Sequence, residues 1–97
     1  METNEFSFQL ERCIVNTAEE LAEDLGMNYS DLARAAFGDR KDYVRRWRKI
    51  RGSKTAKPQR LTISDAALLA RALGKNLPEL VFLANERLKA GWTYVPD

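Results

Sequence analysis

The residues in this chain best suited to chemistry are its lysines and arginines, which are concentrated in one segment. Residues 40–60 contain ten of them and a single acid, Asp42; the ten are Arg40, Lys41, Arg45, Arg46, Arg48, Lys49, Arg51, Lys54, Lys57 and Arg60. This segment has a formal charge of +9, whereas the remaining residues sum to −7 and the whole chain to +2. Cations that neutralise phosphates release condensed counterions, which drives binding to a polyanion whatever its sequence. The segregated charge predicts a polyanionic partner, and a basic segment that is merely solvated is the alternative.

The sequence lacks the usual patterns of catalytic and metal-binding sites. It has no histidine and one cysteine, Cys13, and it contains neither a glycine-rich phosphate-binding loop nor a cluster of His, Cys and carboxylates with metal-ligand spacing. We therefore expect a protein that is not an enzyme and that needs no metal or cofactor.

Length and composition predict one small globular domain over residues 1–97, with 44% hydrophobic and 31% charged residues. Cys13 alone cannot form an intramolecular disulfide, which fits a reducing compartment. The chain has no apolar run of membrane-spanning length, and it begins with acidic residues where a signal peptide would be basic. We expect a cytoplasmic protein with no membrane association.

The elements that must position the basic residues are predicted to be helices. In the first, apolar residues recur every three or four positions and a glycine follows as the stop: Leu10, Ile14, Ala18, Leu21, Leu25 and then Gly26. Two alternatives remain open at its start. Residues 6–10 alternate as a strand would, and Thr17 with Glu20 could be a capping box that begins the helix later. We favour one longer helix.

The next two helices are expected to carry the basic segment. Asn28 caps the second, with Asp31 favouring its N-terminus, and Gly38 ends it. The third covers residues 39–50, with Asp39 as its cap, and its apolar side is narrow: Val44, Trp47 and either Ile50 or Arg51. Such a helix packs through that stripe, with Trp47 in the core, and exposes its basic remainder. Residues 51–61 read as a basic loop.

Two more helices complete the prediction of an all-α fold, a compact bundle of about five helices. Capping boxes at Thr62 with Asp65 and at Asn76 with Glu79 begin the fourth and fifth. Their buried candidates are Ile63, Ala66, Ala67, Leu69, Ala70 and Leu73 in the fourth and Leu77, Leu80, Val81, Leu83, Ala84 and Leu88 in the fifth. Residues 92–97 form a short aromatic tail that either packs onto the bundle or forms a dimer contact.

Three stretches of this chain, taken in order, carry a family resemblance. They are Gly26-Met27-Asn28-Tyr29-Ser30-Asp31-Leu32-Ala33, Val44-Arg45-Arg46-Trp47, and Thr62-Ile63 through Leu69-Ala70-Arg71-Ala72-Leu73-Gly74. Together they resemble the lambda repressor-like (Cro/XRE-type) helix-turn-helix family over roughly residues 17–88, with the motif at about 28–50. The chain departs from that pattern by about one extra residue around Phe37 and Gly38, by Tyr29 in place of a frequent glutamine, and by a longer loop after the third helix.

The resemblance implies that helix 39–50 enters the DNA major groove, N-terminal end first. The positions that match the base-reading sites of the family are Arg40, Lys41, Arg45, Arg46 and Lys49. Arginine suits guanine because its planar fork reaches O6 and N7 together. We expect phosphate contacts from Asn28 and Tyr29 at a helix N-terminus, and sequence-independent contacts from the loop residues Arg51, Lys54, Lys57 and Arg60. The acidic remainder of the chain should turn the other surfaces away from DNA.

We therefore expect a sequence-specific DNA-binding transcriptional regulator of the small phage type. It should be a repressor that binds double-stranded DNA at a two-fold operator as a homodimer, because one short helix reads few base pairs. The dimer surface is expected on the fifth helix and the aromatic tail, or on Phe6 and Phe8. The alternatives are an antitoxin or adaptor that binds a protein partner with DNA binding secondary, and a non-specific nucleic-acid binder.

Overall fold

Five helices account for most of the chain in the computed structural model, which describes residues 3–38, 41–52 and 57–95. They are α1 (Thr3–Asp24), α2 (Tyr29–Phe37), α3 (Lys41–Arg51), α4 (Ile63–Ala72) and α5 (Leu77–Lys89). No strand occurs in these ranges. The prediction of a compact all-α bundle is confirmed, and the Cα radius of gyration is 12.8 Å. Within the described ranges, no helix has the length and apolar character needed to cross a membrane.

Helix α1 is a single element of 22 residues, so residues 6–15 are helical and Thr17 is a buried interior residue, not a cap. It ends in a turn at Gly26, whose φ of 76° lies in the left-handed region that glycine adopts without a Cβ penalty. The amide of Met27 donates to the carbonyl of Ala22 at 2.9 Å across this turn. The longer of the predicted first helices is confirmed.

The predicted capping boxes of α2, α4 and α5 are all present. In each, the cap side chain accepts from the backbone of the third helical residue, whose carboxylate accepts in return from the cap backbone. For Asn28 and Asp31 the two bonds measure 2.8 and 3.0 Å. Each box satisfies two backbone N–H groups that the helix itself leaves without partners, which is why these three helices begin where the sequence predicts.

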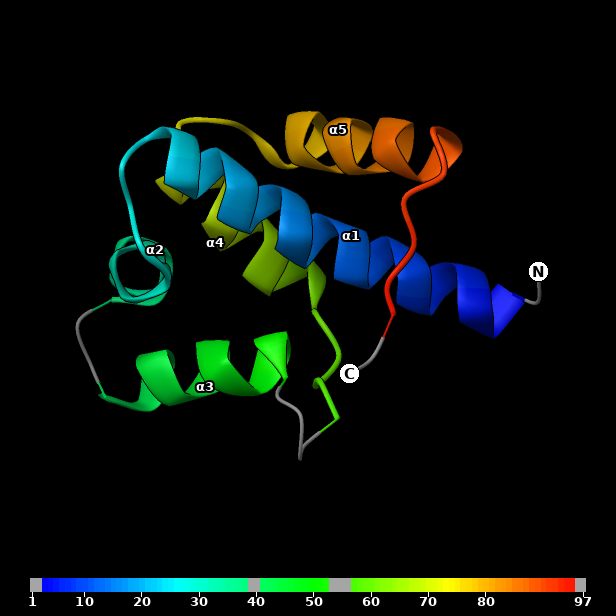
Figure 1. The fold of residues 1–97 in the computed structure, drawn as a ribbon. Helices are drawn as coiled ribbons and strands as arrows, with labels where there is room; N and C mark the ends of the chain where they lie inside the picture. The colour runs from blue at the N-terminus through cyan, green and yellow to red at the C-terminus, as the bar shows by residue number, and fades with distance from the viewer. Residues whose placement is uncertain (1–2, 39–40, 53–56, 96–97) are drawn as a thin grey trace.

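The bundle places α3 and α5 on opposite sides of α1 and α4 (Figure 1). Helix α5 packs along α1, while α2 lies between α4 and α3. The buried hydrophobic core is drawn from all five helices and from Leu61: Cys13, Ile14, Val15, Ala18, Ala22, Leu32, Ala33, Ala36, Phe37, Trp47, Ile50, Leu61, Ala66, Leu69, Ala70, Leu73, Leu80 and Ala84. Trp47 packs against Phe37 with 6.0 Å between ring centroids, so α3 is attached to the core mainly through α2.

Two expectations about the core need correction or completion. Ile63 was expected to be buried and is 78% exposed, because it is the first helical residue after the Thr62 cap and points away from the bundle. Leu61, before the cap, is buried in its place. On α3 it is Ile50, fully buried, that continues the apolar stripe, and Arg51 does not.

The described part of the aromatic tail packs within the chain. The ring of Tyr94 meets that of Phe8 edge-on, with 5.5 Å between centroids, and the Tyr94 amide donates to the Gln9 side chain at 2.7 Å. The Arg87 guanidinium lies 5.8 Å from the centroid of the Trp92 ring. These contacts hold the tail against α1 and α5. Trp92 and Tyr94 therefore pack onto the bundle, which is the first of the two predicted roles of the tail.

Candidate nucleic-acid interface

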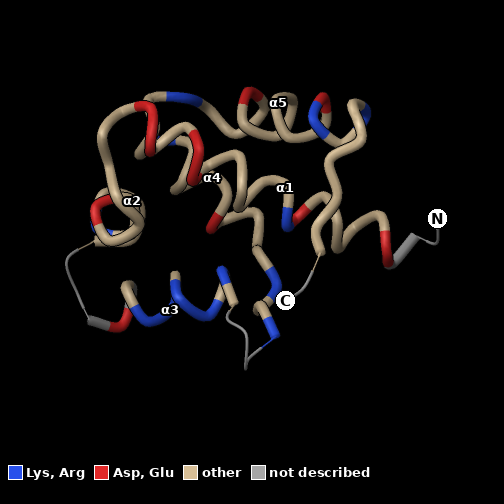
Figure 2. Tube along the Cα trace, viewed as in Figure 1, with Lys and Arg blue, Asp and Glu red and all other residues tan. Residues whose placement is uncertain are grey.

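Helix α3 has one buried side and one exposed, mostly basic side. Trp47 and Ile50, three residues apart, are fully buried, and Val44 is partly buried one turn earlier. Since a helix turns about 100° per residue, the opposite side carries the exposed residues Asp42, Arg45, Arg48 and Lys49. Lysine and arginine follow one another along α3 and recur in the segment leading to α4 (Figure 2). The solvent side of α3 is the candidate interface.

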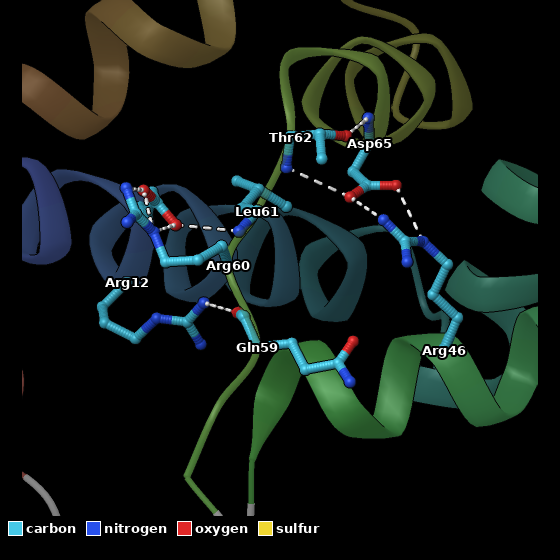
Figure 3. Close-up of polar contacts among 8 residues, drawn as sticks. Arg12, Arg46, Gln59, Arg60, Leu61, Thr62 and Asp65 are labelled. Carbon is cyan, nitrogen blue, oxygen red and sulfur yellow. Dashed lines mark hydrogen bonds and ion pairs between the residues drawn. The ribbon is translucent and has the colours of Figure 1, made fainter.

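One flank of α3 is fixed to α4 by Arg46. Its guanidinium donates to both carboxylate oxygens of Asp65, from Nε at 3.1 Å and from Nη2 at 2.7 Å (Figure 3). Asp65 is only 4% exposed and also accepts from the Thr62 amide. Burial by itself raises the pKa of Asp65, but the hydrogen bonds from Arg46 and Thr62 outweigh it, so the pKa lies below the usual value. Arg46, which was predicted as a base reader, holds α3 to α4 through this pair.

The other flank is fixed to α1 and α2 by Arg51. Its guanidinium donates to Glu19, with Nη2 2.8 Å from Oε2, and lies 4.7 Å from the centroid of the Tyr29 ring. The pKa of the Tyr29 phenol is lowered, mainly through the side chains of Arg48 and Ser30. Arg51 is the last residue of α3, so the predicted loop 51–61 begins one residue later than expected.

The segment that follows α3 returns to it at Gln59. The Gln59 amide donates to the Lys49 carbonyl at 2.9 Å. The buried Arg12 of α1 donates to the carbonyls of both Ile50 and Gln59. Gly52 has a φ of 79°, which favours glycine, and a Cβ placed there would lie 3.0 Å from Pro58, a tight contact that Pro58 would have to relieve by a small shift. Pro58 and Gln59 therefore both lie against the C-terminal end of α3.

Arg12 was not identified from the sequence, although a signal was present. It lies four residues after Phe8 and three before the buried Val15, on a side of α1 that faces the protein interior. It is 3% exposed, and burial, which disfavours the charged form, lowers its pKa. A buried arginine needs hydrogen-bond acceptors, and Arg12 finds them in the backbone carbonyls of Ile50 and Gln59.

Arg60 is paired with an acid of α1. Its Nε and Nη2 atoms lie 2.8 and 2.5 Å from Oε2 of Glu11, whose Oε1 accepts from the Leu61 amide. Burial raises the pKa of Glu11 by itself, but these bonds more than offset that effect and lower it. Arg60 was predicted to contact phosphate from a loop, whereas here it fixes the chain just before α4.

Lys49 and Gln59 border two of the hollows that the described residues form on the exposed basic surface. The larger, of about 500 Å³, is lined by Tyr29, Arg48, Lys49, Arg51, Gly52, Lys57 and Gln59. The smaller, of about 270 Å³, is lined by Asp42, Arg45, Arg46, Lys49 and Gln59. The larger hollow brings four cations together, and the described residues that line it include no carboxylate, which makes it electrostatically suited to an anion.

The predicted site residues fall into exposed residues without an ion pair and residues that are engaged in contacts within the protein. Arg45, Lys49 and Lys57 are exposed, and the described residues contain no ion pair for any of them. Asn28 was expected to bind phosphate, but its side chain and its amide are both used in the capping box. Tyr29 lines the larger hollow, as does Arg48, which the sequence prediction left out of the site. Arg40 and Lys54 lie outside the described residues, and Lys41 begins α3.

No group of three or more potential metal ligands occurs in the part of the chain that the structure describes. Comparisons with protein-family models, with curated proteins and with solved structures give no match. The helix-turn-helix resemblance thus remains a hypothesis drawn from the sequence motifs.

Proposed function

We propose that this protein is a sequence-specific DNA-binding regulator that places the exposed side of α3 in the major groove. The observation that carries the proposal is the arrangement of α3 itself. Its apolar stripe is buried, its two flanks are fixed by the pairs Arg46–Asp65 and Arg51–Glu19, and its outer side presents cations to solvent. The major groove admits an α-helix, and a helix held on three sides can present its fourth in a fixed orientation.

The exposed cations have two roles in this proposal. Arg45 and Lys49, four residues apart on α3, lie along one line of the helix and are the base-reading candidates. An arginine placed there can donate to O6 and N7 of guanine together. Arg48 and Lys57 line the larger hollow and are suited to backbone phosphates, which position the protein without reading sequence.

Regulation and dimerisation complete the proposal. The exposed side of α3 reaches only a few base pairs, so a useful operator requires two copies bound at half-sites about one helical turn apart, ~34 Å. Because the described tail is packed within the chain, we place the dimer contact on other surfaces. Phe82 of α5, which is 61% exposed, is the candidate. We propose repression as the form of regulation, because a repressor can act simply by occupying its operator.

The test is selection of bound duplexes from a random pool at one fixed salt concentration. We expect enrichment of a two-fold symmetric site by the wild type. Arg45→Ala should lose preference at one base pair of each half-site, by roughly 5- to 150-fold in relative affinity. Arg71→Ala, which changes an exposed arginine of α4, is the matched control and should leave the selected site unchanged. If the duplexes bound by the wild type share no common sequence, sequence-specific binding is contradicted.

Non-specific nucleic-acid binding is the second candidate, and the larger hollow favours it. Four cations around a cavity of about 500 Å³ attract phosphates of any sequence. In that case affinity should fall steeply with salt, all duplexes should bind alike, and Arg45→Ala should weaken every duplex equally. The same selection experiment separates the two functions.

A further inference from the structure

Among the described residues that line these two hollows, Gln59 is the one with a neutral amide side chain. It is exposed and borders both, next to Arg45 and Lys49 in the smaller and next to Arg48 and Lys57 in the larger. Figure 3 shows its side chain extending along α3 toward Arg46. Its charged neighbours in the segment, Lys57 and Arg60, were predicted to make sequence-independent contacts.

The backbone of Gln59 is fixed relative to α3. Its N–H donates to the Lys49 carbonyl and its own carbonyl accepts from Arg12, both at 2.9 Å. Arg12 also donates to the Ile50 carbonyl, so one buried guanidinium joins Gln59 to the last turn of α3. The neighbouring Arg60 is held by Glu11. Gln59 therefore projects from a backbone that keeps its place beside the helix.

A neutral amide contributes to such a surface in a different way from its neighbours. Arg45, Lys49 and Lys57 attract any phosphate and gain affinity from counterion release. Gln59 carries no charge, so its contribution comes from directed hydrogen bonds and depends on the group it faces. A glutamine amide donates and accepts at once, a pattern that matches N7 and the N6 amino group of adenine in the major groove.

Resting on the proposed DNA binding, we infer that Gln59 is a specificity-determining residue that reads an adenine beside the bases contacted by α3. The interface then has two reading elements, the outer side of α3 and one side chain from the segment that follows it. Arg12 is a positioning residue for the second, because it sets the distance between Gln59 and α3.

The experiment compares duplexes selected by the wild type, Gln59→Ala and Lys57→Ala at one salt concentration, followed by affinities for the selected site over a range of salt. Gln59→Ala keeps both backbone hydrogen bonds and an exposed position, so it should fold as the wild type does. We expect it to lose an A·T preference at one base pair of each half-site, by roughly 5- to 150-fold, with an unchanged salt dependence. Lys57→Ala, two residues away, should do the reverse, keeping every preference and weakening all duplexes.

Two results would overturn the inference. Selection of the same site by Gln59→Ala with all preferences retained would show that the amide reads no base. An equal loss of affinity on every duplex would identify a phosphate contact. Both results leave the proposed function standing, because the wild type still selects a site. If the wild type selects no site, the proposed function fails and the inference fails with it.

Discussion

Arg45 and Arg46 are neighbours in the sequence and lie in contrasting surroundings on α3. Arg45 is on the outer side, exposed, whereas Arg46 is on the flank and forms a two-point bond with the buried Asp65. The same contrast separates Lys49 from Arg51, which is paired with Glu19. The basic residues of α3 thus form two sets. Arg46 and Arg51 are a supporting set that is paired with acids of other helices, and Arg45 and Lys49 are a presenting set that is exposed on the outer side.

A high density of basic residues in one segment therefore does not make all of their charge available to a partner. The acids outside the basic segment were expected to turn other surfaces away from DNA. Three of them, Glu11, Glu19 and Asp65, instead bind arginines of that segment. These pairs reduce the charge that the segment can offer to phosphates, and they fix the helix that carries the rest.

The largest expected effect is on the side of α3 opposite to the presenting set. Trp47→Ala should lower the free energy of unfolding by about 3–5 kcal/mol, because it removes a fully buried ring that packs on Phe37. Urea unfolding measures this. Arg48→Ala, one residue away and exposed, should change stability by only about 0.5 kcal/mol.

Trp47→Phe keeps an aromatic ring on the buried side of α3. The buried indole N–H of Trp47 has no hydrogen-bond partner among the described residues, so losing it sacrifices no polar contact. The Phe variant should therefore be closer to the wild type than the Ala variant. Equal stability of Trp47→Ala and wild type would show that this side of α3 does not hold the helix.

The next effect separates the flank from the outer side directly. Arg46→Ala leaves the Asp65 carboxylate buried without its cation, and should lower the free energy of unfolding by about 1–3 kcal/mol. Arg46 is 41% exposed, so we expect less than the loss of a fully buried pair. Arg45→Ala, measured in the same urea series, should stay within about 0.5 kcal/mol of the wild type.

The pH dependence of this pair provides the control. Because the pKa of Asp65 is lowered in the folded protein, its ionised form stabilises the fold at neutral pH. That contribution is lost as the pH falls from the ordinary carboxyl pKa through the lowered value. The stability difference between wild type and Arg46→Ala should therefore be largest near neutral pH and shrink in acid. A difference that grows in acid would contradict the role of the pair.

The smallest expected effect concerns two cations of the segment that follows α3. Lys57 is exposed with no ion pair in the described structure, whereas Arg60 is paired with Glu11. Lys57→Ala should reduce the slope of log affinity against log salt by about one unit, the value for one lost phosphate contact. Arg60→Ala should change the slope by less. A larger change for Arg60 would place that residue in the presenting set.

Much of the fold could be predicted because its signals are local. Asn28, Thr62 and Asn76 begin helices through bonds to a residue three positions on, and Gly26 ends one through its own φ. Ile63 shows the limit. Its spacing fits the apolar face of α4, but the start of the helix turns it toward solvent, which helical spacing does not report.

The candidate site was predicted in outline only. The amphipathic character of α3 follows from Val44 and Trp47 within a basic run, and the exposed Arg45 and Lys49 agree with it. The roles of Arg46 and Arg60 depend on acids 19 and 49 residues away in the chain. A pairing at that distance has no periodic signal in the sequence.

The helical class, the starts of three helices and the concentration of positive charge can be derived from the amino-acid sequence, because each depends on residues a few positions apart. Which cations face solvent, which of them hold α3 and where Gln59 lies beside them become visible only in the folded protein. An ion pair or a hollow forms between surfaces that meet only when the chain has folded. Asp65 pairs with Arg46 because α4 packs where its carboxylate reaches the flank of α3.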